Sequence, residues 1–369
     1  MKNTYFLLAS LLFVACNSST NQKNNESAEV SAEPTLIDHA DSSEPHLLNL
    51  HQLTYGGDNA EAYFSFNGRK LVFQSNNKEW GVECDQIFTF DIDEAEKDTL
   101  RAKMVSTGLG RTTCSYFMPD GGHILYGSTH LADSNCPPEV VPEPGGAYLW
   151  SIYEGYDIFV ADLDGNITQQ LTDEPGYDAE ATVSPKGDKI VFTSTRSGDL
   201  ELYTMNIDGS NVVQITDQLG YDGGAFFSPD GSKLVFRSSR PKTPEEIKTY
   251  KDYLARGLVA PTNMEIYTCN ADGSDLKQVT NLGKANWAPF YHPSGKKIIF
   301  SSNHFSERGY EFNLFMINED GTGLEQITTQ SNFNAFPMFS YDGKKLVFSS
   351  NRNNGGTRET NMFIADWVE

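Results

Sequence analysis

A motif built on a four-residue turn recurs six times along this chain, and a short apolar run follows it each time. The turns begin at Ser65, Met118, Ser184, Ser228, His292 and Ser340. Pro, Asp and Gly at these places are typical of a tight turn between two strands, and the apolar run is typical of a buried strand. The chain therefore repeats one turn-and-strand unit.

Two further markers keep a constant order relative to these turns. The Thr of a Gln-aliphatic-Thr triplet lies twelve residues before four of the turns, at Thr172, Thr216, Thr280 and Thr328, and Met104-Val105-Ser106 is a degraded copy at the same spacing. An Asp-Gly turn recurs between the other markers, at Asp164, Asp208, Asp272 and Asp320. Each unit of 44 to 66 residues then holds four short strands. Six such units predict an all-β, six-bladed β-propeller.

The ends of the chain are expected to meet in the last blade. The sixth unit stops after its third strand, at residues 363–367, and the missing triplet stands near the start as Gln52-Leu53-Thr54. An N-terminal strand at residues 47–55 would complete the last blade and leave no open sheet edge. We therefore assign residues 47–369 to the propeller.

These units resemble the TolB-like propeller repeat, a PD-type or WD-like repeat of the form S-P-D-G-x-x-[LI]-x-[FY], over about residues 47–369. That repeat occurs in the translocation protein of the periplasmic Tol system, in non-catalytic domains of prolyl-oligopeptidase-like enzymes and in lipoproteins. The translocation protein has an additional N-terminal α/β domain, whereas about 30 tether residues precede the repeats here. The resemblance implies a binding module of the cell envelope whose partner is a protein or a glycan.

The first sixteen residues are typical of an export signal. The apolar run at residues 5–14 is too short to span a bilayer, which needs about 20 apolar residues. Residues 12–16 resemble the lipobox of bacterial lipoproteins, which implies removal of residues 1–15 and acylation of Cys16. The alternative is an ordinary signal peptide with an incidental cysteine. The polar stretch that follows predicts a flexible tether over residues 16–46.

We accordingly expect a monomer that is lipid-anchored to a membrane of the bacterial cell envelope, on its periplasmic side or at the surface. The formal net charge is −22, from 28 Lys and Arg against 50 Asp and Glu. Because phosphate binding needs a basic face, this charge argues against a nucleic-acid partner. It favours cationic, neutral or metal-ion partners, although an acidic surface also serves solubility alone.

A column of small polar residues stands six positions before the turns. Its members are Asn59, Thr112, Asp178, Asp222, Asn286 and Asn334. Glu61 and Glu180 follow two residues later, and Arg111 precedes the column by one residue. Such a ring at the mouth of a propeller channel could bind a peptide or sugar, or coordinate a cation, and we expect no other cofactor. The alternative is that these side chains cap their own loops.

Two long insertions fall between second and third strands, which places them on the same face as that ring. The first spans residues 127–156 and carries Trp150, and the second spans residues 237–264. Residues 243–246 (Thr-Pro-Glu-Glu) predict a helix start and Gly257 its end, so that the helix presents Tyr253. The aromatic residues suit a sugar or peptide site, or else they pack each loop onto its blade.

Four cysteines remain beyond the export signal, and they do not form a CxxC motif. We expect one disulfide near the mouth, between Cys114 and Cys136, with Cys269 as a buried free thiol. The chain has no G-x-S-x-G or H-E-x-x-H motif, so we favour a non-catalytic binding module. The alternative is a hydrolase or lyase acting on polysaccharide or peptide through carboxylates or a metal at the channel mouth.

Overall fold

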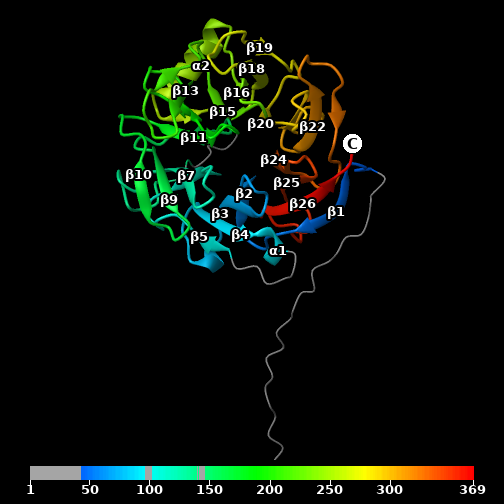
Figure 1. Ribbon diagram of the computed structural model, residues 1–369. Coiled ribbons are helices and arrows are strands. Elements are labelled where there is room, and N and C mark those ends of the chain that lie inside the picture. Colours follow the sequence, from blue (N-terminus) through cyan, green and yellow to red (C-terminus); the bar gives the residue numbers. More distant parts are fainter. Residues whose placement is uncertain (1–42, 96–101, 139, 141–145) are drawn as a thin grey trace, which may run out of the picture. The chain divides into compact units, whose positions relative to one another are not determined.

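Six four-stranded antiparallel sheets follow one another around a ring in the computed structural model (Figure 1). The structure describes residues 43–95, 102–138, 140 and 146–369. The predicted all-β, six-bladed propeller is confirmed. The expected signal peptide, Cys16 and most of the expected tether lie outside the described residues. Within the described ranges no helix is long and apolar enough to cross a membrane.

Each blade uses four strands that follow one another from the centre of the ring outward. Blade 1 contains β2 (Asp58–Phe64), β3 (Lys70–Asn76), β4 (Gln86–Asp91) and β5 (Lys103–Met104). Blade 2 contains β6 (Thr112–Phe117), β7 (His123–Ser128), β9 (Asp157–Asp162) and β10 (Ile167–Gln170). Blade 3 contains β11 (Asp178–Val183), β12 (Lys189–Ser194), β13 (Glu201–Asn206) and β14 (Val213–Gln214).

The other three blades repeat this order. Blade 4 contains β15 (Asp222–Phe227), β16 (Lys233–Ser238), β18 (Glu265–Asn270) and β19 (Lys277–Gln278). Blade 5 contains β20 (Asn286–Tyr291), β21 (Lys297–Ser302), β22 (Asn313–Asn318) and β23 (Glu325–Gln326). Blade 6 contains β24 (Asn334–Phe339), β25 (Lys345–Ser350), β26 (Asn361–Trp367) and, from the other end of the chain, β1 (Leu47–Gln52).

The triplet marker ties the outer strand of each blade to the third strand. In blade 3, the Thr216 hydroxyl accepts a hydrogen bond from the Leu202 N–H at 2.9 Å, and the Gln214 amide donates to the Thr216 carbonyl at 2.8 Å. Ser106 of the degraded copy accepts in the same way from the Ile87 N–H. The triplet therefore recurs because its side chains satisfy backbone N–H and C=O groups at the place where the outer strand ends its pairing with the third strand.

β1 closes the ring, as the displaced triplet predicts. It pairs antiparallel with β26, from Leu47 opposite Trp367 to Gln52 opposite Phe363, and Figure 1 shows β1 (blue) beside β26 (red). The Thr54 hydroxyl accepts from the Met362 N–H at 2.9 Å, which is the contact that the triplet makes in other blades.

The propeller begins a few residues before the expected boundary at residue 47. Glu44 is buried and forms an ion pair with Arg352 at 3.0 Å. Its carboxylate also accepts hydrogen bonds from the N–H groups of Thr329 and Gln330. Residues 43–46 thus contact blades 5 and 6 instead of belonging to the tether.

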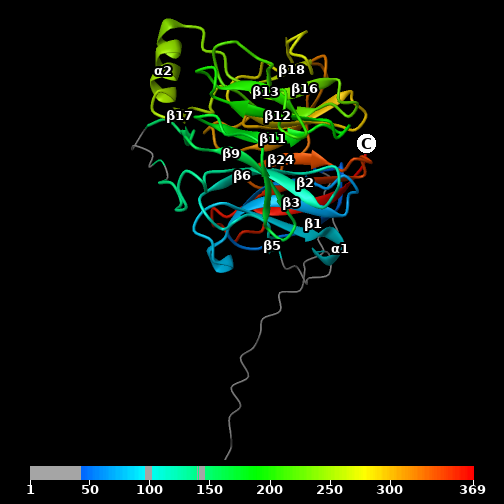
Figure 2. The ribbon, with the colours of Figure 1, turned by 60° about the vertical axis from the view of Figure 1, so that its left-hand side comes forward.

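The two insertions meet above blade 3. β8 (Trp150–Ser151) of the first pairs antiparallel with β17 (Leu258–Val259) of the second. α2 (Pro244–Leu254) begins at the Thr243 cap with a complete capping box, as predicted, and Figure 2 shows it outside the blades. The two remaining short helices are η1 (Lys78–Trp80) and α1 (Ile92–Ala95) in blade 1. We call the β8–β17 pair the bridge.

Candidate binding cavity

Each innermost strand contains a β-bulge at the same repeat position. The register of the first two strands shifts there in all six blades, for example between Ala60 and Tyr63 in blade 1. The bulged residues are Glu61, Cys114, Glu180, Gly224, Ala288 and Phe336, and their φ angles lie between 45° and 59°. A bulge redirects a side chain, and these six residues all line a central cavity.

This central cavity has a volume of about 800 Å³. Tyr63 of blade 1 and Phe226 of blade 4 belong to opposite blades, yet their ring centroids are 5.4 Å apart. Tyr116 contacts both of these rings and Phe290 contacts Phe226, so aromatic rings fill the axis and form the floor. The cavity has a volume typical of a ligand pocket, and the aromatic floor closes it at one end.

Aromatic side chains also form the walls. Trp150 belongs to the bridge, and its ring centroid lies 5.1 Å from that of Trp287. Trp287 in turn stacks on Phe312, with 4.1 Å between the ring centroids. The Trp287 indole N–H donates to the Pro261 carbonyl at 2.8 Å, which fixes the ring against the second insertion. Further wall residues are Tyr153, Tyr156, Tyr177, Tyr221 and Phe333, and Tyr148 and Tyr310 are exposed lining residues.

We call the six bulged residues the bulge ring, and Glu180 is its most strongly bound carboxylate. It forms an ion pair with Arg237 and accepts hydrogen bonds from the Tyr221 hydroxyl at 2.7 Å, the Thr193 hydroxyl at 2.7 Å and the Gly224 N–H at 2.9 Å. Burial acts to raise the pKa of Glu180, but Arg237 and these donors lower it below its ordinary value. Glu180 is therefore ionised and fully occupied by protein groups.

The guanidinium of Arg237 lies between the bulge ring and the bridge. It lies 4.9 Å from the ring centroid of Tyr221 and 5.3 Å from that of Trp150. A Cβ atom on Gly224 would come within 1.9 Å of its Nη1 atom, so this bulge position has no room for a side chain. Arg237 joins the charged and aromatic parts of the wall.

Glu61 differs from Glu180 in having few donors. The Tyr63 hydroxyl lies 3.4 Å from its Oε2 atom, and the thiol of Cys114 is its other hydrogen-bond partner. Burial raises the pKa of Glu61 to about 7, and the nearby charge of Glu180 adds to this effect. The cavity therefore has one carboxylate that changes charge near neutral pH.

The members of the predicted polar ring are buried and bound to protein groups. Its six members, Asn59, Thr112, Asp178, Asp222, Asn286 and Asn334, are at most 2% exposed. Asn59 is typical, because its amide donates to the Gly56 and Thr360 carbonyls while its oxygen accepts from Ser75. Asp178 and Asp222 instead form ion pairs with Arg196 and Arg240. Of the six, only Thr112 lines the cavity.

Glu61, Glu180, Arg111 and Trp150 are the predicted site residues that the fold does bring to the cavity. Arg111 binds Asp85 at 2.5 Å, and both residues line it. Tyr253 lies on α2 and is not a lining residue. The sequence offered no signal for Arg237, whereas Tyr177 and Tyr221 could have been found as residues directly before the polar column. Cys114 could have been found as the residue two positions after Thr112, the repeat position that Glu61 and Glu180 share.

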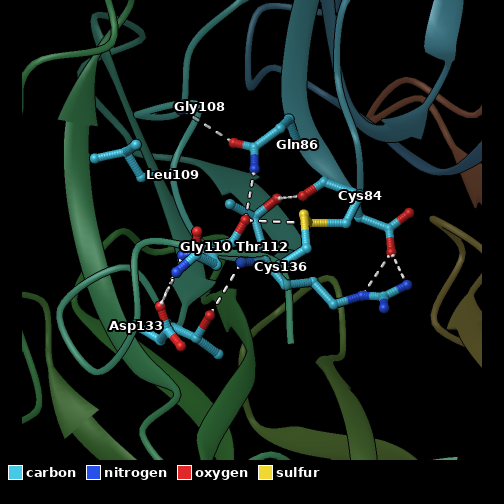
Figure 3. The surroundings of a disulfide bond; sticks show 12 residues. Cys84, Gln86, Gly108, Leu109, Gly110, Thr112, Asp133 and Cys136 are labelled. Atoms are coloured by element: carbon cyan, nitrogen blue, oxygen red, sulfur yellow. Dashed lines mark hydrogen bonds and ion pairs between the residues drawn. A yellow bond between two sulfur atoms is a disulfide. The ribbon is translucent and has the colours of Figure 1, made fainter. Parts of the chain in front are cut away.

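The predicted Cys114–Cys136 disulfide is wrong. The bond joins Cys84 to Cys136 (Figure 3). Cys114 and Cys269 are free. The bulge directs Cys114 into the cavity beside Glu61, away from Cys136. A bridge among the first three cysteines and a buried free Cys269 are confirmed.

The disulfide lies beside a loop that Figure 3 shows against the end of blade 1. The Gln86 amide donates to the Gly110 carbonyl at 3.0 Å and its oxygen accepts from the Gly108 N–H at 3.1 Å. Gly110 has a φ of 60°, and a Cβ atom there would lie 2.7 Å from the backbone nitrogen of His130. The bond thus attaches the first insertion to a rigid part of blade 1.

The described residues contain no group of three or more His, Cys, Asp or Glu able to hold a metal ion.

Comparison with known proteins agrees with this fold. The family model PD40, TolB beta propeller domain, matches residues 147–242. Searches among curated proteins find no significant match. Putative TolB from Agrobacterium tumefaciens is similar in structure, with a TM-score of 0.55 and 18% identity over 85% of this chain and 91% of that chain.

Two further solved structures are similar at low sequence identity. TolB from Acinetobacter baumannii has a TM-score of 0.56 and 18% identity over 83% of this chain and 65% of its own. A chain of a nidogen/laminin complex has a TM-score of 0.50 and 13% identity over 74% of this chain and 81% of its own. Likeness at these identities shows the fold alone.

Proposed function

We propose that this TolB-like propeller is a lipid-anchored binding module of the bacterial cell envelope, which takes a segment of a protein partner into the central cavity. One observation carries the proposal, namely a cavity of about 800 Å³ that has aromatic walls, an aromatic floor and charged side chains set among the rings. Concave, mostly apolar sites with a small number of placed polar groups are typical of ligand recognition. Loops on a rigid scaffold commonly carry such sites.

The rim of the cavity also suits a protein partner. Tyr148 and Tyr310 are 55% and 64% exposed, and both line the cavity. Exposed aromatic side chains beside a pocket are typical of protein-binding surfaces. One chain of similar fold comes from a solved nidogen/laminin complex, and this supports a protein as the partner.

Trp150→Ala tests the cavity as the binding site. A displayed random-peptide library would be selected on the wild-type protein, and the Kd of the enriched peptides measured by calorimetry. We expect the variant to lose about 2 kcal/mol, or about 30-fold in affinity, because a buried aromatic anchor is removed. Leu324→Ala, at an exposed residue outside the cavity lining, is the control and should leave the Kd unchanged.

Hydrogen exchange of the complex gives a second readout. Slower exchange should appear in β8, β17 and the first residues of the innermost strands. Slower exchange confined to the Asp208-Gly209 and Ser228-Pro229 turns, together with an unchanged Kd in Trp150→Ala, would contradict a cavity site. A glycan ligand is the second candidate, since aromatic walls also suit sugar rings, and an oligosaccharide array screened in parallel would reveal it.

The enzymatic alternative would use Glu61 and Glu180 as an acid–base pair. The many donors to Glu180 disfavour it, because they leave that carboxylate little freedom to take a proton. A propeller that cleaves peptides or oligosaccharides from the same libraries, and loses this activity in Glu180→Gln, would favour it.

The anchor has its own test. In cells supplied with a labelled fatty acid, the wild-type protein should carry the label and Cys16→Ser should not, because acylation needs the thiol. The variant should also leave the membrane fraction, since stable anchoring depends on the acyl chains. Cys269→Ser is a matched control. Label retained in Cys16→Ser would contradict lipidation at this residue.

A further inference from the structure

Among the described residues that line the central cavity, one carboxylate forms no ion pair. Asp85 is paired with Arg111, and Glu180 is paired with Arg237. Glu61 lines the same cavity and has no ion pair among the described residues. When Glu61 is ionised, the cavity therefore has an excess of one negative charge over these groups.

The groups facing Glu61 do not supply that missing charge. Tyr63 of its own strand and Cys114 of β6 are neutral, because burial raises their pKa values well above the ordinary ones. Glu180 of β11 is negative, and Arg237 of β16 is already bound to it. On the blade 6 side, the bulge residue is Phe336, which has no charge. Glu61 is thus left with donors that are weak and uncharged.

The surroundings suit a cation with an apolar stem. Aromatic faces attract ammonium groups, and the attraction grows when water is excluded. The walls present aromatic rings from several blades, and the floor that closes the cavity includes the ring of Tyr63. A lysine side chain can lay its methylene groups along such walls while its charged end reaches a carboxylate.

We propose that the central cavity recognises the ammonium group of a lysine side chain in a peptide chain, and that Glu61 is the carboxylate that receives it. This inference rests on the proposed function, because it names the chemistry of the segment that enters the cavity. Glu61 is a ligand-binding residue, and Glu180 with Arg237 holds the wall beside it.

Proton release accompanies binding at neutral pH. Free Glu61 has a raised pKa of about 7, so below that pH it is mostly protonated. An ammonium group favours the ionised form and lowers the pKa, so the carboxyl must give up its proton on binding. Affinity should therefore rise about tenfold from pH 6 to pH 8, which follows the ionised fraction of a group with this pKa. A lysine ammonium stays charged throughout this range.

The test compares two peptides that differ only in charge. The probes are acetyl-Gly-Lys-Gly-amide and the same peptide with an acetylated lysine side chain, titrated at millimolar concentration into the full chain with NMR detection. The expected result is that the lysine peptide binds at least about tenfold more tightly and that Glu61→Gln abolishes both this preference and the pH dependence. Glu245→Gln removes the same charge from exposed α2 and should change neither.

The outcomes are separable. Equal binding of the two peptides in the cavity, with unchanged affinity in Glu61→Gln, overturns the inference and leaves the proposed function standing. Failure of both peptides to bind, while library peptides without lysine do bind the cavity, also overturns it. A preference for chitosan tetramer over chitotetraose, with no preference between the peptides, would assign the ammonium group to an amino sugar instead. Thermal unfolding of Glu61→Gln checks that the variant is folded.

Discussion

Buried carboxylates in this propeller divide into those that hold loops and those that face the cavity. Asp222 is fully buried, and both its oxygens accept hydrogen bonds from Arg240, at 2.6 and 2.8 Å. Glu61 stands two positions after Asn59, the residue of its own repeat that corresponds to Asp222, and lies instead on a bulge that opens into the cavity. Two residues along one strand thus separate a structural acid from a candidate binding acid.

Asp222→Ala tests that division. It leaves the guanidinium of Arg240, which is 13% exposed, without its anion, so we expect the free energy of unfolding in urea to fall by about 3 kcal/mol. Peptide affinity should stay unchanged, because Asp222 does not line the cavity. Asp164→Ala removes a surface ion pair with Lys103 and should change stability by less than about 1 kcal/mol. Lost affinity with full stability in Asp222→Ala would restore the polar ring as a binding element.

The bridge shows what the strands and insertions contribute together. β8 and β17 come from insertions of blades 2 and 4, and their pairing places Trp150 between Trp287 and Arg237. The Ile152 N–H donates to the Gly257 carbonyl at 2.7 Å, at the residue where the turn after α2 reverses the chain. Each insertion alone would be a long exposed loop, and paired they form a fixed wall of the cavity.

The propeller as a closed ring depends on a strand from the far end of the chain. Every other blade takes its four strands in order, and blade 6 takes β1 as its outer strand. Contacts between neighbouring blades bury the aromatic second strands, in which Phe73, Phe192 and Phe348 are inaccessible to solvent. Closure therefore protects both the edge of β26 and the packing of blades 1 and 6.

Deletion of residues 43–52 should destabilise the fold severely. It removes Glu44 and the buried Leu47 and Leu50, and it exposes the edge of β26. With about 2 kcal/mol for each buried leucine, the free energy of unfolding should fall by at least about 4 kcal/mol, measured by urea denaturation. Deletion of residues 17–33 shortens the chain without removing a strand of the propeller and is the control. An unchanged transition in the first deletion would show that blade 6 does not need β1.

Much of the fold follows from local patterns. Turns with Gly at a φ between 66° and 72°, triplets that satisfy strand ends, and alternating apolar residues are short-range features, so their spacing alone predicts blades, strand order and the closing strand. α2 (Pro244–Leu254) was predictable for the same reason, since its cap Thr243 and the glycine that follows it, Gly257, are its near neighbours in sequence. The family resemblance adds the likeness to TolB propellers, which the comparisons support.

The cavity could be predicted only in part, because it depends on residues that are distant in sequence. Glu61, Cys114, Gly224 and Phe336 share a backbone conformation but no side-chain chemistry, so no motif marks the bulge ring. Cys114 stands between two cysteines in sequence, yet its bulge directs it to the axis, and Cys84 pairs with Cys136 instead. The polar column was predicted as a site because Asx residues recur there, but its members are buried, and Asp222 is paired with Arg240. Such differences arise because the direction of a side chain at a bulge is set by strand register and by packing around the ring, neither of which is a local property of the chain.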